Sequence, residues 1–175
     1  MKLLILGGYG VFGGRLAQLL ADEPRLTLLI AGRDLARAQA FCAHWTGAAR
    51  VQPIQADRAN LAPVLAQHKP CILVDASGPF QAYGEARYAA INAAIAAQVN
   101  YLDLADGAEF VAGVGAFNGA ARAAGVFVLS GVSSFPVLTA AVLREAAQTM
   151  QITDVEGGIA PSPHAGVGMN VMRAV

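Results

Sequence analysis

Three glycines near the N-terminus have the spacing of a phosphate-binding turn. Gly8, Gly10 and Gly13 form the pattern G-x-G-x-x-G, which follows the apolar run 3–6 and opens a stretch with helical periodicity. In that position the first glycine permits a tight turn, the second lets the backbone approach a pyrophosphate, and the third lets the helix pack close to the strand. The N–H groups of the first helical turn would face the phosphates. The pattern favours dinucleotide binding over a strand-to-helix turn that merely tolerates glycine.

The second apolar run ends in an arginine where an acid is usual. Sites for NAD or FAD carry Asp or Glu there to accept hydrogen bonds from the ribose, whereas this run ends in Ala31, Gly32 and Arg33. A guanidinium suits a 2′-phosphate, and Arg37 follows one helical turn later. We therefore expect NADP rather than NAD, the alternative being an ordinary surface arginine. Asp34 is expected to cap the next helix.

Other candidate ligand contacts stand at the ends of later runs, because ligands of such sheets lie at the carboxyl ends of the strands. Asp57 follows the third run, where the adenine amine passes, although a helix cap suits it equally. The segment DASGPFQAYGE follows the fourth run and should border the nicotinamide half, unless its Gly-Pro pair marks only a turn. The predicted cofactor-binding residues are Gly8, Tyr9, Gly10, Val11, Phe12, Gly13, Gly32, Arg33, Asp57, Ser77, Gly78, Pro79 and Phe80.

No catalytic residue can be assigned from the sequence. Of Asp103, Asp106 and Glu109, which follow the fifth run, at least one should cap the next helix, and the hydroxyls of SGVSSFP after the sixth run can reach a substrate or satisfy a loop. A Tyr-x-x-x-Lys pair, a loop cysteine nucleophile and a G-x-S-x-G elbow are all absent. Cys42 and Cys71 form no CxxC pattern and have no nearby pair of histidines, so we expect reduced thiols and no metal site.

Short apolar runs alternate with alanine-rich amphipathic stretches along the chain. Near-continuous apolar runs of this kind indicate parallel strands covered on both faces. They predict an α/β fold, a Rossmann-type doubly wound parallel sheet of six strands in the order 3-2-1-4-5-6 with helices on both faces. The strands are expected near 3–6, 26–30, 51–55, 72–75, 101–104 and 126–129, and the helices near 12–22, 34–44, 60–67, 82–97, 108–124 and 136–149. This domain should span 1–150, with 151–175 starting a second, substrate or dimerisation domain or a tail.

Composition narrows the partners of the chain. Twelve acidic residues balance 12 basic ones, which favours neither nucleic acid nor a membrane surface. Only 14% of residues are charged and 55% are hydrophobic, so a covered face and a homodimer are expected. The uncharged stretch 123–143 is long enough to span a bilayer, but its glycine, serines and proline favour a strand, loop and helix. We expect a cytoplasmic protein that acts on a small molecule.

The chain resembles the N-terminal NADP-binding domain of the saccharopine dehydrogenase (saccharopine reductase) family. The resemblance rests on GGYGVFG, AGRD, DASGPFQAYGE, YLDLADGAEF and SGVSSFPVLTAAV, within residues 5–142. It departs from the family pattern at Ala94, where a cysteine is common, and at Asp106-Gly107, where Gly-Glu is common. The resemblance implies an oxidoreductase that transfers hydride between a nicotinamide and a carbonyl or imine. The alternative is a sensor or scaffold that binds NADP without turning over a substrate.

Overall fold

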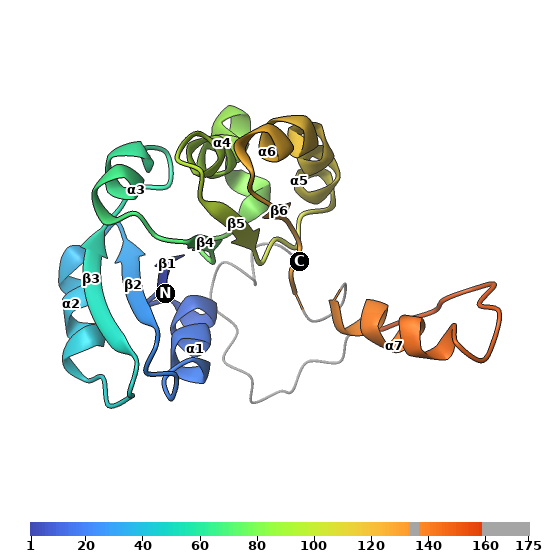
Figure 1. Cartoon of the computed structure of the whole chain (residues 1–175), viewed down its shortest axis with the longest axis horizontal. Helices are drawn as coiled ribbons and strands as arrows, with labels where there is room; N and C mark the ends of the chain where they lie inside the picture. The colour runs from blue at the N-terminus through green and yellow to red at the C-terminus, as the bar shows by residue number, and fades with distance from the viewer. Residues whose placement is uncertain (134–136, 159–175) are drawn as a thin grey trace.

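Six parallel strands form one sheet in the predicted order. The computed structural model describes residues 1–133 and 137–158. The sheet runs β3-β2-β1-β4-β5-β6 (Figure 1), with a crossover to the far side of β1 after β3. The strands are β1 (Lys2–Leu6), β2 (Thr27–Gly32), β3 (Arg50–Gln55), β4 (Ile72–Asp75), β5 (Asn100–Asp103) and β6 (Val128–Leu129). The prediction of a Rossmann-type α/β sheet is confirmed.

Helices cover both faces of the sheet and divide its core in two. On one face lie α1 (Val11–Leu19) and α2 (Leu35–Ala43), packed with the side chains Leu28 and Ile30 of β2. On the other face lie α3 (Ala62–His68), α4 (Ala89–Ala96), α5 (Ala108–Gly113) and α6 (Asn118–Ala124), packed with Leu29 and Ala31 of the same strand. Successive side chains of a strand point to opposite faces, so β2 contributes to both halves of the core.

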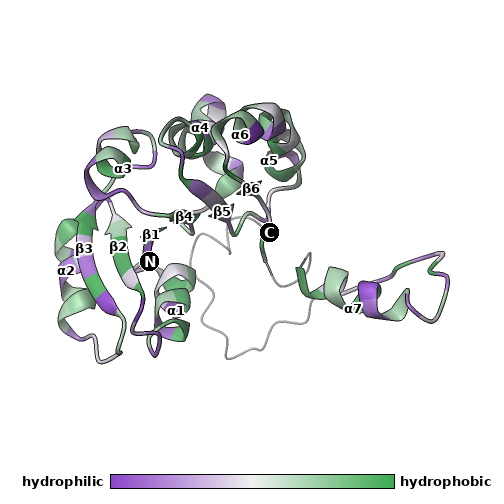
Figure 2. Ribbon diagram, viewed as in Figure 1, coloured by the Kyte–Doolittle hydropathy of each residue, from purple (hydrophilic) through white to green (hydrophobic). Residues whose placement is uncertain are grey.

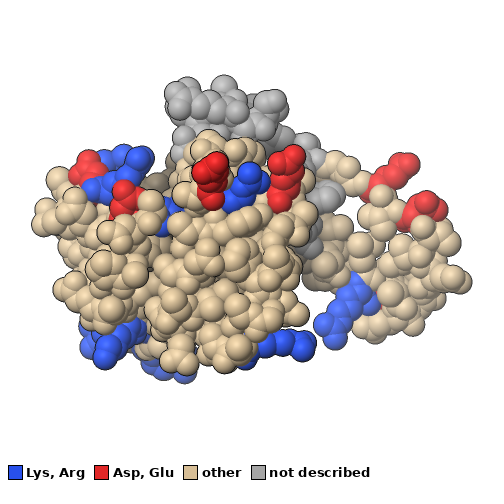
Figure 3. All heavy atoms as spheres, turned by 90° about the horizontal axis from the view of Figure 1, so that it is seen from above, with Lys and Arg blue, Asp and Glu red and all other residues tan. Residues whose placement is uncertain are grey.

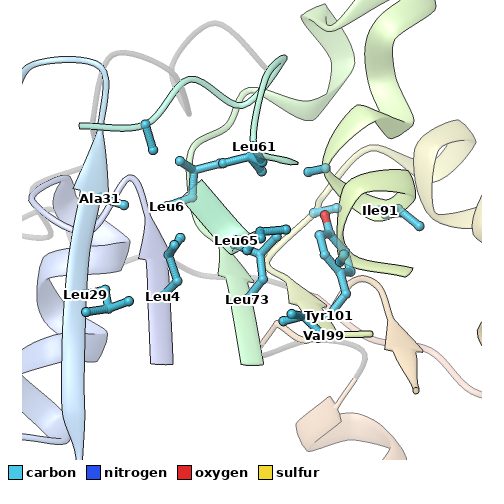
Figure 4. Packing of buried hydrophobic residues seen from close by; sticks show 14 of the residues in the cluster. Leu4, Leu6, Leu29, Ala31, Leu61, Leu65, Leu73, Ile91, Val99 and Tyr101 are labelled. Carbon is cyan, nitrogen blue, oxygen red and sulfur yellow. The ribbon is translucent and has the colours of Figure 1, made fainter. Parts of the chain in front are cut away.

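One row of side chains crosses the four central strands. In the register of the sheet Leu29 is opposite Leu4, Leu4 is opposite Leu73, and Leu73 is opposite Tyr101. All four are at most 1% exposed, and Figure 4 shows them beneath Leu61, Leu65 and Ile91 of the covering segments. Burial of a leucine of this kind contributes about 1.5–3 kcal/mol. The packing of this row sets how far the carboxyl ends of the strands, where the site lies, extend relative to one another.

The two edges of the sheet are less apolar or shorter than its centre. Strand β3 (RVQPIQ) contains both hydrophilic and hydrophobic residues (Figure 2), and β6 has two residues. Helix α7 (Thr139–Ala146) stands apart from the sheet in Figure 1. Its N-cap residue Leu138 and the helical residue Val142 are both exposed. Charged side chains are sparse on the face drawn in Figure 3. The homodimer expected from low charge stays a prediction.

The helix predicted over 82–97 is shorter than expected. Residues 80–88 form two 3-10 turns, η1 (Phe80–Ala82) and η2 (Gly84–Tyr88), and α4 begins only at Ala89. Gly84 adopts a left-handed conformation with φ of +55°, which no α-helix contains. The carbonyls of Ala86 and Arg87 accept hydrogen bonds from the guanidinium of Arg58. A long-range side chain therefore shapes this segment.

The helix predicted over 108–124 is broken in the middle. It divides into α5, the 3-10 turn η3 (Val114–Phe117) and α6. The carbonyl of Phe110 accepts the hydroxyl of Tyr88 at 3.1 Å, and the N–H of Val114 bonds to Val111, three residues back instead of four. A Cβ on Gly113 would overlap that same tyrosine hydroxyl. The break follows from a tyrosine that packs against the helix from another segment.

Candidate functional site

An open cleft of about 980 Å³ lies across the carboxyl ends of the central strands. Ligands of doubly wound sheets bind at this edge, where the strand order reverses. Most of the predicted cofactor residues line the cleft, namely Tyr9, Gly10, Val11, Phe12, Gly32, Arg33, Asp57, Ser77, Gly78 and Pro79. Gly8 and Gly13 are buried beneath the loop. Phe80 is 5% exposed and packs edge-on against Tyr83 and Phe110, so it supports the wall from behind.

The glycine loop leaves no room for side chains where it turns. A Cβ on Gly13 would overlap the carbonyl oxygen of Gly7, and a Cβ on Gly8 would lie 2.7 Å from the carbonyl oxygen of Ile5. Gly7, which the sequence pattern did not single out, has φ of +76° and passes close to the backbone of Ala76. The N–H groups of Gly7 and Gly8 both bond to the carbonyl of Ala31. Glycine is therefore required at these positions, because a side chain would collide with neighbouring backbone atoms.

This loop delivers the start of α1 to the cleft. Gly10 is the N-cap of α1 and has no side chain to bond to the first-turn N–H groups. Those N–H groups have no carbonyl partners within the helix, and they carry a partial positive charge. The backbone thus forms an anion cradle that a side chain would fill. Such a cradle fits the pyrophosphate of a dinucleotide.

Two arginines stand near the end of β2, Arg33 directly after the strand and Arg37 in the first turn of α2. Arg33 and Arg37 are exposed and line the cleft. Within the described residues, no carboxylate lies within salt-bridge distance of either guanidinium. Asp34 accepts the backbone N–H of Arg37 at 3.1 Å and caps α2, as predicted. Two guanidinium groups that form no salt bridge among the described residues fit a bound phosphate monoester.

Asp57 lines the cleft at the end of β3 but does not cap a helix. Its Oδ1 accepts the N–H of Ala59 at 2.9 Å, and it pairs with Asn60 in an isolated bridge. The N-cap of α3 is Leu61, which makes no side-chain capping bond. The helix-cap alternative for Asp57 is wrong, because the chain closes a tight turn before α3 begins.

Arg58, which lines the cleft, forms a largely buried ion pair with Asp75. The arginine Nε donates to Asp75 Oδ2 at 2.7 Å, and the side chains are 10% and 0% exposed. The guanidinium carbon lies 3.7 Å from the ring centroid of Tyr83, and further N–H groups bond to the carbonyls in η2. Arg58 thus joins the β3–α3 loop, the end of β4 and η2. This contact could not be predicted from the sequence, because no local pattern relates position 58 to position 75.

Two hydroxyls in the cleft wall connect to the same carboxylate. Ser77 Oγ donates to Asp75 Oδ1 at 2.6 Å and lies 2.9 Å from the hydroxyl of Tyr83. Burial, followed by the negative charge of Asp75, raises the pKa of Tyr83 to about 12. Tyr83 therefore keeps its proton near neutral pH and donates it to Ser77, because the serine proton is already engaged by a carboxylate that only accepts. This order of bonds fixes the loop after β4.

Asp103 at the end of β5 is fully buried and is not among the residues that line the cleft. Its Oδ1 accepts from the N–H groups of Ala105 and Gly131 and from Ser130 Oγ. The N-cap of α5 is Gly107, with no side-chain capping bond. The expectation that Asp103, Asp106 or Glu109 caps this helix is therefore wrong. Asp103 instead ties the β5–α5 loop to the segment after β6. Of the other two serines of SGVSSFP, Ser133 is half-buried and Ser134 lies outside the described residues.

The second oxygen of Asp103 predicts a stability that depends on pH. Oδ2 is buried, and no partner for it exists within the part of the chain that the structure describes. Burial raises the pKa of Asp103, although the surrounding N–H and hydroxyl donors oppose the shift. Between the ordinary pKa of an aspartate and this raised pKa, the folded chain binds more protons than the unfolded chain, so the group's stabilising contribution is complete at low pH and is lost as the pH rises through the raised pKa.

We expect Asp103→Asn to gain stability relative to the unsubstituted chain as the pH rises from 4 to 8, since the amide keeps an acceptor and carries no charge. Urea unfolding at several pH values measures the difference. A constant difference across that range would contradict a raised pKa of Asp103.

A small hollow of about 50 Å³ adjoins the cleft on the β5 side. It is bordered by Phe12, Pro79, Phe80 and Leu104, with Asp106 at the rim. Asp106 accepts a hydrogen bond from Gln81 at 3.0 Å.

No group of three His, Cys, Asp or Glu side chains in the described ranges is placed to hold a metal ion. None of the described helices combines the length and apolar character needed to cross a membrane.

Comparison with known proteins places residues 3–151 in the family described as "Saccharopine dehydrogenase NADP binding domain". No curated protein matches the chain. Among solved structures, apo saccharopine dehydrogenase (L-Glu forming) from Saccharomyces cerevisiae aligns with a TM-score of 0.64 at 18% identity, covering 84% of this chain and 31% of the other. GenD2 from gentamicin A biosynthesis, solved with NAD, aligns with a TM-score of 0.53 at 23% identity, covering 85% and 39%. The chain therefore spans well under half the length of both proteins.

Proposed function

Because the chain belongs to the saccharopine dehydrogenase NADP-binding domain family, we propose that its cleft binds NADP in preference to NAD and serves an oxidoreductase. The observation that carries the cofactor preference is the pair of unpaired arginines, Arg33 and Arg37, at the end of β2. An acid at this position would accept the ribose hydroxyls of NAD. A guanidinium there instead offers a planar set of donors to a 2′-phosphate.

The remaining parts of the cleft suit the other parts of the cofactor. The first turn of α1 would hold the pyrophosphate through backbone N–H groups. The loop Ser77–Pro79 and the side chain of Phe12 would border the nicotinamide half. When bound, the cofactor supplies a hydride to a carbonyl or imine carbon, and the protein supplies its orientation. We propose a small-molecule substrate and assign no proton donor from this chain.

Substitution of Arg33 tests the preference. Arg33→Ala should weaken NADPH binding by roughly 10- to 100-fold, the value of a hydrogen bond to a charged group, and leave NADH binding unchanged. Titration of the full chain with NADPH and NADH, followed by nicotinamide fluorescence, measures both dissociation constants. Arg50→Ala is the matched control, since Arg50 is exposed at the opposite end of the sheet. Equal binding of the two cofactors by the unsubstituted chain would overturn the proposal.

A second candidate function is NADP binding without catalysis, as in a sensor or scaffold. It is favoured by the described side chains that line the cleft and the hollow, because within residues 1–133 and 137–158 they include no lysine or histidine that could move a proton. Oxidation of NADPH in the presence of a panel of carbonyl and imine compounds distinguishes the two functions. Selective binding without any oxidation would favour the sensor.

A further inference from the structure

Tyr9 joins the glycine loop to the end of β2. Its ring lies against Gly32, where a Cβ would come within 2.6 Å of Tyr9 Cε1 and Cζ. Its hydroxyl accepts the backbone N–H of Asp34 at 3.0 Å. The second residue of the G-x-G-x-x-G pattern is therefore held by contacts with the neighbouring strand end. Gly32 is required there because any larger residue would displace the tyrosine.

The same tyrosine contacts one of the two unpaired arginines. The guanidinium carbon of Arg37 lies 4.9 Å from the centroid of the Tyr9 ring, within the range of a cation–π interaction. Asp34, whose N–H bonds to Tyr9, also accepts the N–H of Arg37 through its side chain. Tyr9 thus contacts both the backbone that begins α2 and the side chain that projects from its first turn.

Arg37 would otherwise be a flexible surface side chain. It is exposed, and within the described residues no carboxylate pairs with it. An arginine side chain loses substantial rotamer entropy when a ligand immobilises it. A ring that already holds the guanidinium at the cleft reduces that loss. The gain applies to a ligand that bonds to Arg37 and not to a ligand that leaves Arg37 untouched.

We propose that Tyr9 is a positioning residue that determines cofactor selectivity: it holds Arg37 beside the site for the adenosine 2′-phosphate. The inference rests on the proposed NADP preference. Tyr9 acts through Arg37, so it raises the affinity for NADPH and not that for NADH. Because Tyr9 also belongs to the glycine loop, the pyrophosphate cradle and the 2′-phosphate site share one rigid connection.

The test compares dissociation constants of NADPH and NADH for the full chain. Tyr9→Leu removes the ring, and we expect the ratio of NADH to NADPH dissociation constants to fall about fivefold, as for an exposed cation–π contact, with NADH binding unchanged. Tyr9→Phe keeps the ring and should keep most of the ratio. Tyr88→Phe is the matched control for the loss of a tyrosine hydroxyl, because the Tyr88 hydroxyl also bonds to the backbone, donating to the carbonyl of Phe110, but lies outside the cleft.

A double-mutant cycle separates positioning from a general structural role. Arg37→Ala should lower the ratio by itself, and adding Tyr9→Leu to Arg37→Ala should lower it no further. A further fall in the double variant, or an equal loss of NADPH and NADH binding in Tyr9→Leu, would overturn the role of Tyr9. If the unsubstituted chain prefers NADPH and Arg33→Ala abolishes that preference while Tyr9→Leu retains it, only this inference fails. If the unsubstituted chain has no preference, the proposed function fails as well.

Discussion

Replacing Arg58 by alanine should lower the free energy of unfolding by about 3–5 kcal/mol, because it leaves Asp75 buried without its cation. Asp75 is fully buried, and its Oδ2 would keep only a 3.4 Å contact with the hydroxyl of Tyr101. The substitution also removes the guanidinium from the ring of Tyr83 and frees the carbonyls in η2. Urea unfolding followed by circular dichroism measures the loss.

The protein contains a matched control for this prediction. Arg25 and Glu23 form an ion pair of the same length, 2.7 Å, at the surface. Arg25→Ala should change the stability little, because solvent screens an exposed pair. Adding Asp75→Asn to Arg58→Ala should restore part of the lost stability by removing the stranded charge. If the double variant unfolds at the same urea concentration as the single one, the loss comes from packing rather than from charge.

Gly13→Ala should abolish most of the dinucleotide binding while leaving the sheet intact. The added Cβ overlaps the carbonyl oxygen of Gly7, so α1 and the loop must separate. Loss of even one N–H to phosphate bond corresponds to about 1.5–3 kcal/mol. We therefore expect dissociation constants for both NADPH and NADH to rise by roughly 10- to 100-fold, measured by nicotinamide fluorescence.

Gly119→Ala serves as the control for a methyl group added to a helical glycine. A Cβ on Gly119 in α6 meets nothing within 4 Å, so binding should be unchanged and stability should rise by about 0.5 kcal/mol. Unchanged NADPH binding by Gly13→Ala would show that the loop accommodates the methyl group. It would remove the steric basis for the glycine at that position.

The fold could be predicted from the sequence because its pattern is local. Six apolar runs separated by amphipathic stretches determine the number and order of the strands, and handedness rules supply the crossovers. The breaks at η2 and η3 could not be predicted, because they depend on contacts between distant residues. The guanidinium of Arg58 donates hydrogen bonds to the carbonyls of Ala86 and Arg87. The hydroxyl of Tyr88 donates to the carbonyl of Phe110. Periodicity contains no information about such pairs.

The candidate site, like the fold, has parts that could be predicted from the sequence and parts that could not. Gly8, Gly10, Gly13 and Arg33 were accessible to sequence reasoning, because their types and spacing reflect backbone clearance and charge at a strand end. The network of Arg58, Asp75, Ser77 and Tyr83 was not, since it joins three loops whose proximity only the folded sheet creates. A signal existed in Gly7, which follows β1 directly. The positive φ of Gly7 favours glycine at that position, but this is difficult to recognise in the sequence because Gly8 is adjacent.

The hydrogen bonds that tie the glycine loop to β2 have a consequence for the rate of ligand capture. Gly7 and Gly8 share the carbonyl of Ala31, and Gly10 bonds back to Gly7. A loop so constrained has little chain entropy left to lose, and no slow closing step needs to precede tight contact with a phosphate. Encounter by diffusion would then set the pace of association, and residence time would account for differences in affinity between one dinucleotide and another.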